Sequence, residues 1–217
     1  MLKMNEIQNG FEGITLENIG KKFRDQWIFR RVSLEIKKGE KIAVTGQNGS
    51  GKSTFLQLLS GYITQSEGNI TWLSPGKNIP TEQIYQYISL ASPHLELIEE
   101  FTLEENVIFF SRYKKFHKDV TATSLIERSG LGSNSTKQVK NFSSGMKQRI
   151  KLALAFMADT PLLLIDEPLT NLDAAGYEWY QSMIAELPDN RTVILCSNQV
   201  KEETFFCNRF IDVEKFK

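Results

Sequence analysis

The sequence predicts an α/β protein with a mainly parallel sheet, an N-terminal antiparallel β subdomain and an inserted helical subdomain. Three features of the 217 residues carry this prediction. The first 45 residues resemble strands, residues 102–158 are mainly helical in pattern, and strands alternate with helices around that insert. Such alternation is typical of a parallel sheet.

The first half of the chain contains four predicted strands and one helix. Residues 31–37 alternate apolar and polar side chains, and 42–44 form a short apolar run that leads into glycine. Residues 53–60 have the apolar spacing of a helix. Residues 68–72 and 85–91 are expected to be strands.

The second half begins with a capping box, in which Glu105 stands three residues after Thr102. Helical segments then extend to Ala158, with a break near residues 130–132. Beyond them we expect a buried strand at 162–165, a helix at about 174–187 and a strand at 192–196.

Composition and charge exclude several classes of protein. The 41% hydrophobic and 24% charged residues are ordinary for a globular domain. Lys plus Arg and Asp plus Glu both number 26, so bulk charge gives no reason to expect a nucleic-acid partner. The longest uncharged stretch, residues 53–66, is shorter than the roughly 20 apolar residues of a membrane-spanning helix. Residues 1–6 contain no apolar run, so we expect no secretory signal.

Two cysteines, Cys196 and Cys207, are too few for a disulfide framework. Cys196 stands in an apolar run and is expected to be a buried thiol. These features together predict a cytoplasmic protein.

Residues 46–53 match the pattern G-x-x-x-x-G-K-[ST] of a phosphate-binding loop. The glycines let backbone N–H groups curl around phosphate oxygens, and the following helix directs its positive end at the anion. Lys52 is expected to reach the β- and γ-phosphates of a nucleotide, and Ser53 to ligate Mg²⁺. The alternative is a glycine-rich turn with an idle lysine, but the flanking strand and helix favour a P-loop NTPase core. The expected nucleotide-binding residues here are Gly46, Asn48, Gly49, Ser50, Gly51, Lys52, Ser53 and Thr54.

Two carboxylates end the apolar run at residues 162–165. Burying two charges without a use is costly, and the carboxyl ends of parallel strands face the ligand crevice. Asp166 therefore suits Mg²⁺, and Glu167 suits a general base that polarises water. The alternative is a solvated acidic turn before Pro168.

Taken together, these motifs resemble the ATP-binding subunit of ABC transporters from about Ile14 to Asp212. Phe23 stands where that family stacks an aromatic ring on adenine, and 142–149 resembles its signature motif. Residues 166–167 resemble the family's Walker B end, and 171–173 its D-loop. The helix after the signature offers N–H groups to an anion, although an N-capped structural helix is the alternative.

The resemblance implies a single ATP-binding domain over residues 1–217, with a helical subdomain at about 93–145. It implies an ATPase that uses ATP and Mg²⁺ and sits peripherally on the cytoplasmic face of the membrane. Ser143 and Gly145 would face the γ-phosphate bound by a second subunit, in a homodimer or heterodimer enclosing two ATP molecules. An integral membrane subunit would be a separate chain. The strand at residues 68–72 resembles that of small haem exporters.

Three features depart from the family pattern. Ser92 stands near the family's glutamine and is shorter toward Mg²⁺, and Asn198 replaces the switch histidine and cannot carry a proton. The signature has Ser144 and Met146 where glycine and glutamine are usual. His94 either compensates for Ser92 or is a surface histidine, and the second interpretation is favoured. Ser92 is kept as a metal-site candidate, and Asn198 joins Lys52 and Glu167 as a catalytic candidate.

Five aromatic residues of the insert allow two interpretations. The family uses this region as a groove for a membrane subunit's coupling helix, whereas helical spacing alone favours ordinary core packing for most of them. They are Phe101, Phe109, Phe110, Tyr113 and Phe116.

The sequence thus favours an ATPase subunit of a transporter. One alternative is a slow or non-hydrolysing ATP-dependent clamp or regulatory module, which the departures at Ser92 and Asn198 would suit. Another is an ATPase acting on DNA or ribosomes, which the neutral charge and single cassette disfavour.

Overall fold

The computed structural model describes residues 10–198 and 201–217, and the chain forms two compact units. The first unit comprises the residues up to 88, the segment 160–166 and the residues from 188 onward. The second unit comprises residues 89–159 and 167–187. No helix within the described part of the chain is long and apolar enough to span a bilayer.

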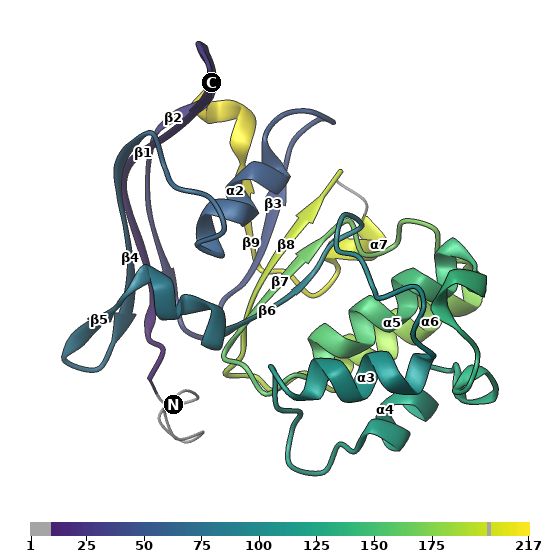
Figure 1. Ribbon diagram of the computed structural model, residues 1–217. Helices are drawn as coiled ribbons and strands as arrows, with labels where there is room; N and C mark the ends of the chain where they lie inside the picture. The colour runs from purple at the N-terminus through teal and green to yellow at the C-terminus, as the bar shows by residue number, and fades with distance from the viewer. Residues whose placement is uncertain (1–9, 199–200) are drawn as a thin grey trace. The chain divides into compact units, whose positions relative to one another are not determined.

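An antiparallel sheet forms one side of the first unit (Figure 1). Its strand order is β2-β1-β4-β5. The hairpin between β1 and β2 closes where Phe23 pairs with Gln26, and Arg24 in the turn has φ 52°. This sheet confirms the predicted antiparallel subdomain. The strands are β1 (Gly13–Phe23), β2 (Gln26–Lys37), β4 (Glu67–Ser74) and β5 (Lys77–Ile79).

A five-stranded sheet has the order β6-β7-β8-β3-β9. Strand β3 pairs in parallel with β8 and β9, and β7 pairs in parallel with β8. Every residue of β7 and β8 is buried, which explains their continuous apolar runs and confirms Cys196 as a buried thiol. The strands are β3 (Lys41–Thr45), β6 (Ile88–Ala91), β7 (Leu162–Asp166), β8 (Thr192–Ser197) and β9 (Arg209–Asp212).

Helix α2 (Lys52–Leu59) packs between these two sheets (Figure 1). The Phe55 ring meets the Phe29 ring of β2 edge-on at 5.9 Å, and the indole N–H of Trp72 in β4 donates to the Leu59 carbonyl at 2.9 Å. The helix also contacts β7 and β8. Because both faces are packed, the residues at its N-terminus are held in place.

The second unit is mainly helical. The capping box predicted at Thr102 is confirmed, since its hydroxyl accepts from the Glu105 N–H and the Glu105 carboxylate accepts from the Thr102 N–H. The helices are α3 (Leu103–Ser111), α4 (Ala122–Arg128), α5 (Ser144–Met157) and α6 (Ala174–Ala185), with 3₁₀ turns at Gly132–Asn134 and Val139–Asn141. In the first unit, the remaining helical segments are Thr81–Gln86, α7 (Lys201–Thr204) and Val213–Phe216.

The predicted fold class is confirmed, but some predicted bounds are wrong. The strand expected at 85–91 begins only at Ile88, because residues 81–86 form a 3₁₀ turn after Pro80. The helix expected to reach residue 187 ends at Ala185, two residues earlier and before Pro188.

Lys114, which follows α3, supplies a test of how burial affects stability. Burial lowers the pKa of its ammonium from 10.5 to about 8. Between these values the unfolded chain holds a proton that the folded chain releases, so the free energy of unfolding rises with pH across this window. Lys114→Met is expected to raise the free energy of unfolding at pH 7 by about 1–3 kcal/mol, because it removes a buried charge. It should also reduce the increase of this free energy with pH.

Urea unfolding at pH 7, 9 and 10 measures both effects, with the exposed neighbour Lys115→Met as the control. An equally steep pH dependence in Lys114→Met and the wild type would contradict this account of Lys114.

Candidate functional site

The phosphate-binding loop connects β3 to α2 in the first unit. Gly49 and Gly51 have φ of 77° and 106°, in the left-handed region that strains any residue with a Cβ. A Cβ at Gly51 would lie 2.4 Å from the Ile28 side chain, whereas nothing lies within 4 Å of one at Gly49. The loop is therefore packed against β2 on one side and has open space at its tip.

Lys52 is the first residue of α2, and its side chain is folded back beneath the loop. Its ammonium donates to the carbonyl oxygens of Gly46 at 2.9 Å and Gln47 at 3.1 Å. It also donates to Asn198 Oδ1 at 2.6 Å, so two predicted catalytic residues from distant parts of the sequence meet directly. Only 5% of Lys52 is exposed, and these acceptors compensate for the desolvation of its charge.

The loop fits the phosphates of a nucleotide. Loop carbonyls face the Lys52 ammonium, α2 directs its N-terminal N–H groups at the loop, and the tip at Gly49 is open. The hydroxyl of Ser50 is buried and has no hydrogen-bond partner in the described residues, as expected of a group that a ligand oxygen would satisfy.

Oxygen donors suited to Mg²⁺ also belong to this unit. Asp166 ends β7 with 4% of its surface exposed, and Ser53 lies in the first turn of α2. Mg²⁺ is commonly held by one or two protein oxygens plus phosphate oxygens and water. A carboxylate and a hydroxyl fit that donor set, although no group of three or more His, Cys, Asp or Glu within residues 10–198 and 201–217 would hold a metal by itself.

Phe23, the candidate for stacking on adenine, ends β1 at the hairpin. Phe23 is 48% exposed, so part of this aromatic residue is open to solvent. The ammonium of Lys21 lies over the ring at 4.9 Å from its centre. Thr54, another predicted nucleotide-binding residue, is half-buried in the first turn of α2.

Glu167, the candidate general base, lies at the start of the loop after β7, in the second unit. Its φ of 45° is unusual for a residue with a side chain and suggests a functional constraint. The Thr170 hydroxyl donates to its carboxylate at 3.5 Å, and the Thr170 N–H donates to its carbonyl at 3.3 Å. The Gln148 amide donates to the Pro168 carbonyl at 3.1 Å, which fixes the same turn to α5.

The signature motif forms the N-terminus of α5. Ser143 caps this helix by accepting from the Met146 N–H at 3.2 Å, and Ser143 itself is exposed. A Cβ at Gly145 would lie 2.6 Å from the Asn171 carbonyl, so only glycine lets the D-loop approach this closely. Around them is a cavity of ≈ 350 Å³. It is lined by Leu131, Ser143, Ser144, Gly145, Met146, Arg149, Asn171, Leu172 and Asp173.

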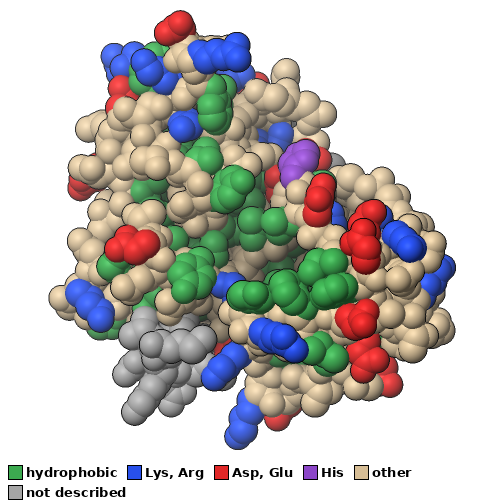
Figure 2. All heavy atoms as spheres, viewed as in Figure 1, with side chains coloured by type: hydrophobic (Ala, Val, Ile, Leu, Met, Phe, Trp, Pro, Cys, Tyr) green, Lys and Arg blue, Asp and Glu red, His purple; other side chains and the backbone are tan. Residues whose placement is uncertain are grey.

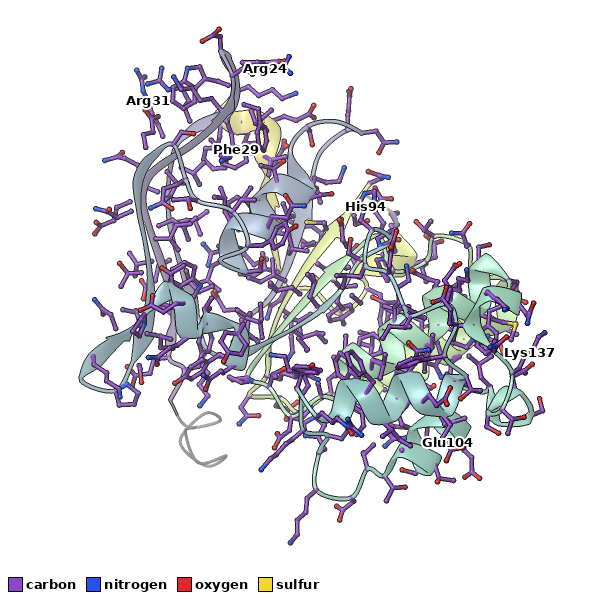
Figure 3. All side chains as sticks on the ribbon, in the orientation of Figure 1. Arg24, Phe29, Arg31, His94, Glu104 and Lys137 are labelled. Atoms are coloured by element: carbon purple, nitrogen blue, oxygen red, sulfur yellow. The ribbon has the colours of Figure 1, made fainter. Side chains whose placement is uncertain are left out.

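Ser92 lies in the second unit just after β6, and it is buried with 8% of its surface exposed. Its hydroxyl accepts from the His94 N–H at 3.4 Å, so the local turn already uses this candidate metal ligand. The His94 side chain is exposed (Figure 3), as its interpretation as a surface histidine requires.

The five aromatic residues singled out above surround and follow α3, and the prediction that most are core residues is wrong. None of them is buried, and Phe109 and Tyr113 are 38% and 69% exposed. Phe109 links them, since its ring centre lies 5.9 Å from that of Phe101 and 5.2 Å from that of Tyr113. Figure 2 shows exposed hydrophobic side chains next to acidic ones on this unit.

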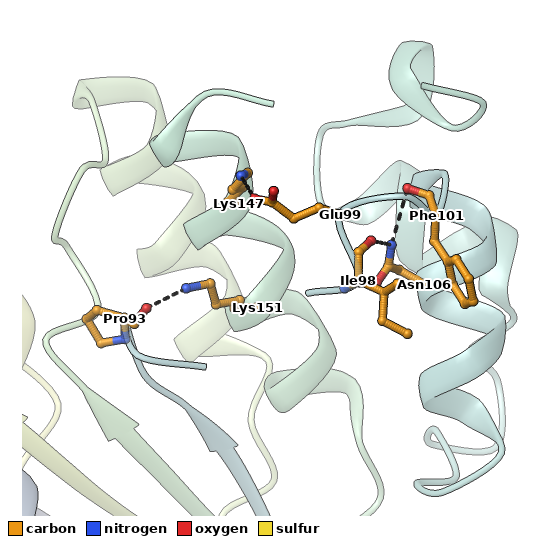
Figure 4. Close-up of polar contacts among 7 residues, drawn as sticks. All are labelled: Pro93, Ile98, Glu99, Phe101, Asn106, Lys147 and Lys151. Carbon is orange, nitrogen blue, oxygen red and sulfur yellow. Dashed lines mark hydrogen bonds and ion pairs between the residues drawn. The ribbon is translucent and has the colours of Figure 1, made fainter. Parts of the chain in front are cut away.

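A second cavity of ≈ 620 Å³ is lined mainly by the segment that precedes α3 and by two lysines of α5. Lys151 donates to the Pro93 carbonyl at 2.8 Å, Lys147 pairs with Glu99, and Asn106 donates to the Ile98 carbonyl at 2.9 Å (Figure 4). Burial lowers the pKa of Lys151, and the positive charge of Lys147 lowers it further. The lining residues are Pro93, Leu95, Glu96, Leu97, Ile98, Glu99, Glu100, Val139, Lys147 and Lys151.

Two residues of this unit, Gln148 and Arg149, belong to the motif at 142–149, but their roles were not predicted from the sequence. Gln148 holds the turn that carries Glu167, and its signal was a polar side chain on a largely apolar helix. Arg149 lines the signature cavity, lies 3.9 Å from Asp173 and stacks its guanidinium over Trp179 at 5.4 Å. Its only sequence signal was its place at the end of the signature motif.

The sequence from residue 29 to 170, more than half of the chain, matches the family model described as ABC transporter. The chain belongs to the ABC transporter family.

Relatives within the ABC transporter family carry names of export and resistance systems. The chain is 31% identical to linearmycin resistance ATP-binding protein LnrL of Bacillus subtilis (strain 168), over 89% of this chain and 63% of LnrL. It is 32% identical to Nod factor export ATP-binding protein I of Bradyrhizobium diazoefficiens, over 93% and 67% of the two chains. The chain spans about three fifths to two thirds of the length of several relatives.

Solved structures of ABC transporter proteins share this fold. A dimeric post-hydrolysis structure of the ATP-binding cassette MJ0796 bound to ADP and Pi has a TM-score of 0.75 at 23% identity, covering 92% of this chain and 93% of that one. An inward-facing putative metal-chelate type ABC transporter has a TM-score of 0.73 at 23% identity, covering 95% and 81%. At this identity the likeness is one of fold.

The contact between Lys52 and Asn198 predicts the effect of a charge at position 198. Asn198→Asp is expected to weaken ATP binding at least about tenfold, which is about 1.4 kcal/mol. The new carboxylate would hold Lys52 in an ion pair and repel the phosphates.

Isothermal titration calorimetry with Mg-ATP measures the loss. Asn190→Asp, at an exposed site in the same unit, controls for the change in net charge. Unchanged affinity in Asn198→Asp would mean that Lys52 does not share a site with the nucleotide phosphates.

Proposed function

We propose that this chain is the ATP-binding and ATP-hydrolysing subunit of an ABC transporter. The observation that carries the proposal is the buried ammonium of Lys52 beneath a glycine loop at the N-terminus of α2. That arrangement presents positive charge and N–H donors to one anionic ligand. Family membership adds the expectation that the ligand is ATP.

ATP binding uses residues of the first unit. Residues 46–54 bind the phosphates, with Lys52 turned toward the β- and γ-phosphates, and Phe23 stacks on adenine. Ser53 and Asp166 would hold Mg²⁺, with Ser92 as a further candidate. When bound, Mg²⁺ would neutralise phosphate charge as it develops.

In the proposed hydrolysis reaction, Glu167 is the general base. Its carboxylate accepts a proton from the water that attacks the γ-phosphate, which contributes about 10²–10⁴-fold to the rate. The fixed turn around Glu167 orients the carboxylate before the reaction begins. The Asn198 amide supplies a hydrogen bond to the γ-phosphate but moves no proton.

Two copies of an ATP-binding subunit pair head to tail in this proposal. The N-terminus of α5, with the exposed Ser143 and the close approach at Gly145, presents N–H donors to the γ-phosphate held by the other copy. The cavity around these residues gives that phosphate a place to enter. The partner copy is identical or a related chain.

In this proposal an integral membrane subunit docks on the second unit. Its support is the cavity before α3 and the exposed aromatic residues Phe109 and Tyr113. Bound in this way, the protein would lie on the cytoplasmic face of the membrane. The names of the relatives that contain the words export and resistance support outward transport. The haem-exporter subtype stays a prediction, and none of the relatives named above supports it.

A second candidate function is a slow ATP-dependent clamp. Two observations favour it. The Lys52 ammonium donates a hydrogen bond to Asn198, and the Ser92 hydroxyl accepts one from the nearby His94 N–H. Such a protein would bind ATP and pair, and would release phosphate rarely.

Glu167→Gln separates the two functions. In the enzyme, this substitution is expected to lower the steady-state rate of phosphate release by about 10²-fold or more while ATP affinity stays unchanged. Phosphate release is measured with and without the membrane subunit, and affinity by calorimetry. Glu178→Gln, at an exposed position of the same unit, is the matched control.

Wild-type protein that binds ATP but releases no phosphate beyond a single turnover, even with its membrane subunit, would be a clamp. Turnover that persists in Glu167→Gln would assign the general base elsewhere.

A further inference from the structure

Basic and aromatic side chains gather at the turn between β1 and β2. Figure 2 shows blue side chains clustered at the top of the view, and Figure 3 labels Arg24 and Arg31 there, with Phe29 toward the interior. The sequence from Lys21 to Arg31 has five basic residues and only one acidic residue, Asp25. Phe23 and Trp27 are the aromatic residues nearest the turn.

One member of this cluster is fixed against Phe23. The Lys21 ammonium lies over the Phe23 ring, 4.9 Å from its centre, within the range of a cation–π contact. The same ammonium donates to the Thr64 carbonyl at 2.7 Å. These two contacts restrain the Lys21 side chain, so the Phe23 ring has a charged neighbour on one face, while Phe23 as a whole is 48% exposed.

The segment that anchors Lys21 follows the helix of the phosphate loop. Residues 60–66 lead out of α2, and further hydrogen bonds through Ser66 join them to the end of β1. The Lys22 N–H donates to the Ser66 hydroxyl at 3.1 Å, and the Ser66 N–H donates to the Gly20 carbonyl at 2.8 Å. The position of Phe23 is thus tied, through this segment, to the helix that begins at Lys52.

We propose that Lys21 is a positioning residue for nucleotide binding, which places the Phe23 ring and leaves its opposite face for the adenine base. The proposal rests on the proposed function, in which Phe23 stacks on adenine. The Lys21 cation attracts the π-electrons of the ring toward itself, and the electron-poorer opposite face suits stacking on an electron-rich base. Because the ring is ordered before the nucleotide arrives, less conformational entropy is lost on binding.

The expected effect is modest and specific to the base. An exposed cation–π contact corresponds to about a two- to fivefold change in affinity. Lys21→Met, which keeps the length of the side chain without its charge, should weaken ATP binding by that factor. Inorganic tripolyphosphate, which carries no base, should bind equally well to both proteins. Lys21→Arg should restore ATP binding, since a guanidinium also stacks on an aromatic ring.

A double-mutant cycle on the full chain tests whether Lys21 acts through Phe23. Affinities for ATP and tripolyphosphate are measured by calorimetry for Lys21→Met, Phe23→Ala and the double variant. Phe23→Ala should weaken ATP binding about fivefold or more, and adding Lys21→Met to it should have no further effect. Lys22→Met is the matched control, because Lys22 lies over Trp27 at 5.4 Å. An unchanged thermal midpoint in each variant reports an intact fold.

Three results would overturn the role of Lys21. One is an ATP affinity that is unchanged in Lys21→Met, and another is a further loss of ATP affinity when Lys21→Met is added to Phe23→Ala. The third is an equal loss of affinity for ATP and tripolyphosphate in Lys21→Met, which would make Lys21 a phosphate ligand. A different result would remove the stacking assignment itself: Phe23→Ala binding ATP as tightly as the wild type. If no variant and no wild-type protein binds ATP, the proposed function fails as a whole.

Discussion

The buried ammonium of Lys52 is the constraint on which the site depends. A charge that is 95% removed from solvent must be surrounded by acceptors, and the carbonyl oxygens of Gly46 and Gln47 turn inward to supply them. The glycines permit the left-handed conformations that this turn requires. Helix α2 holds the lysine in place because it is packed between two sheets, through Phe55 on one side and β7 and β8 on the other.

In the second unit, neutral hydrogen-bonding groups stabilise the turn that contains Glu167. Glu167 adopts a left-handed backbone conformation, and the Gln148 amide and the Thr170 hydroxyl and N–H stabilise the turn around it. At the start of α5, the missing side chain of Gly145 lets the Asn171 carbonyl approach. The turn that carries Glu167, the candidate general base, and the N-terminus that opens α5 are therefore both fixed to this helix, so movement of α5 would carry the two together.

Local signals in the sequence were sufficient for most of the fold, because apolar periodicity, the capping box at Thr102 and the glycines of the phosphate loop act over a few residues. The short strands β5 and β9 carry no such signal and form only by pairing with β4 and β3. The contact between Lys52 and Asn198 joins residues 146 positions apart, beyond any local pattern. The exposure of Phe109 was missed because helical spacing describes a shared face, and whether that face is covered depends on tertiary packing.

In the proposed mechanism, two copies of an ATP-binding subunit enclose ATP between the phosphate loop and the signature motif. The direct test is light scattering of Glu167→Gln with and without Mg-ATP. We expect a monomer without nucleotide and a dimer of about twice the mass with Mg-ATP. Adding Gly145→Ala should abolish the dimer, because the new Cβ would clash with the Asn171 carbonyl. A monomer in Mg-ATP, at concentrations where calorimetry shows the site filled, would contradict pairing of this chain with itself.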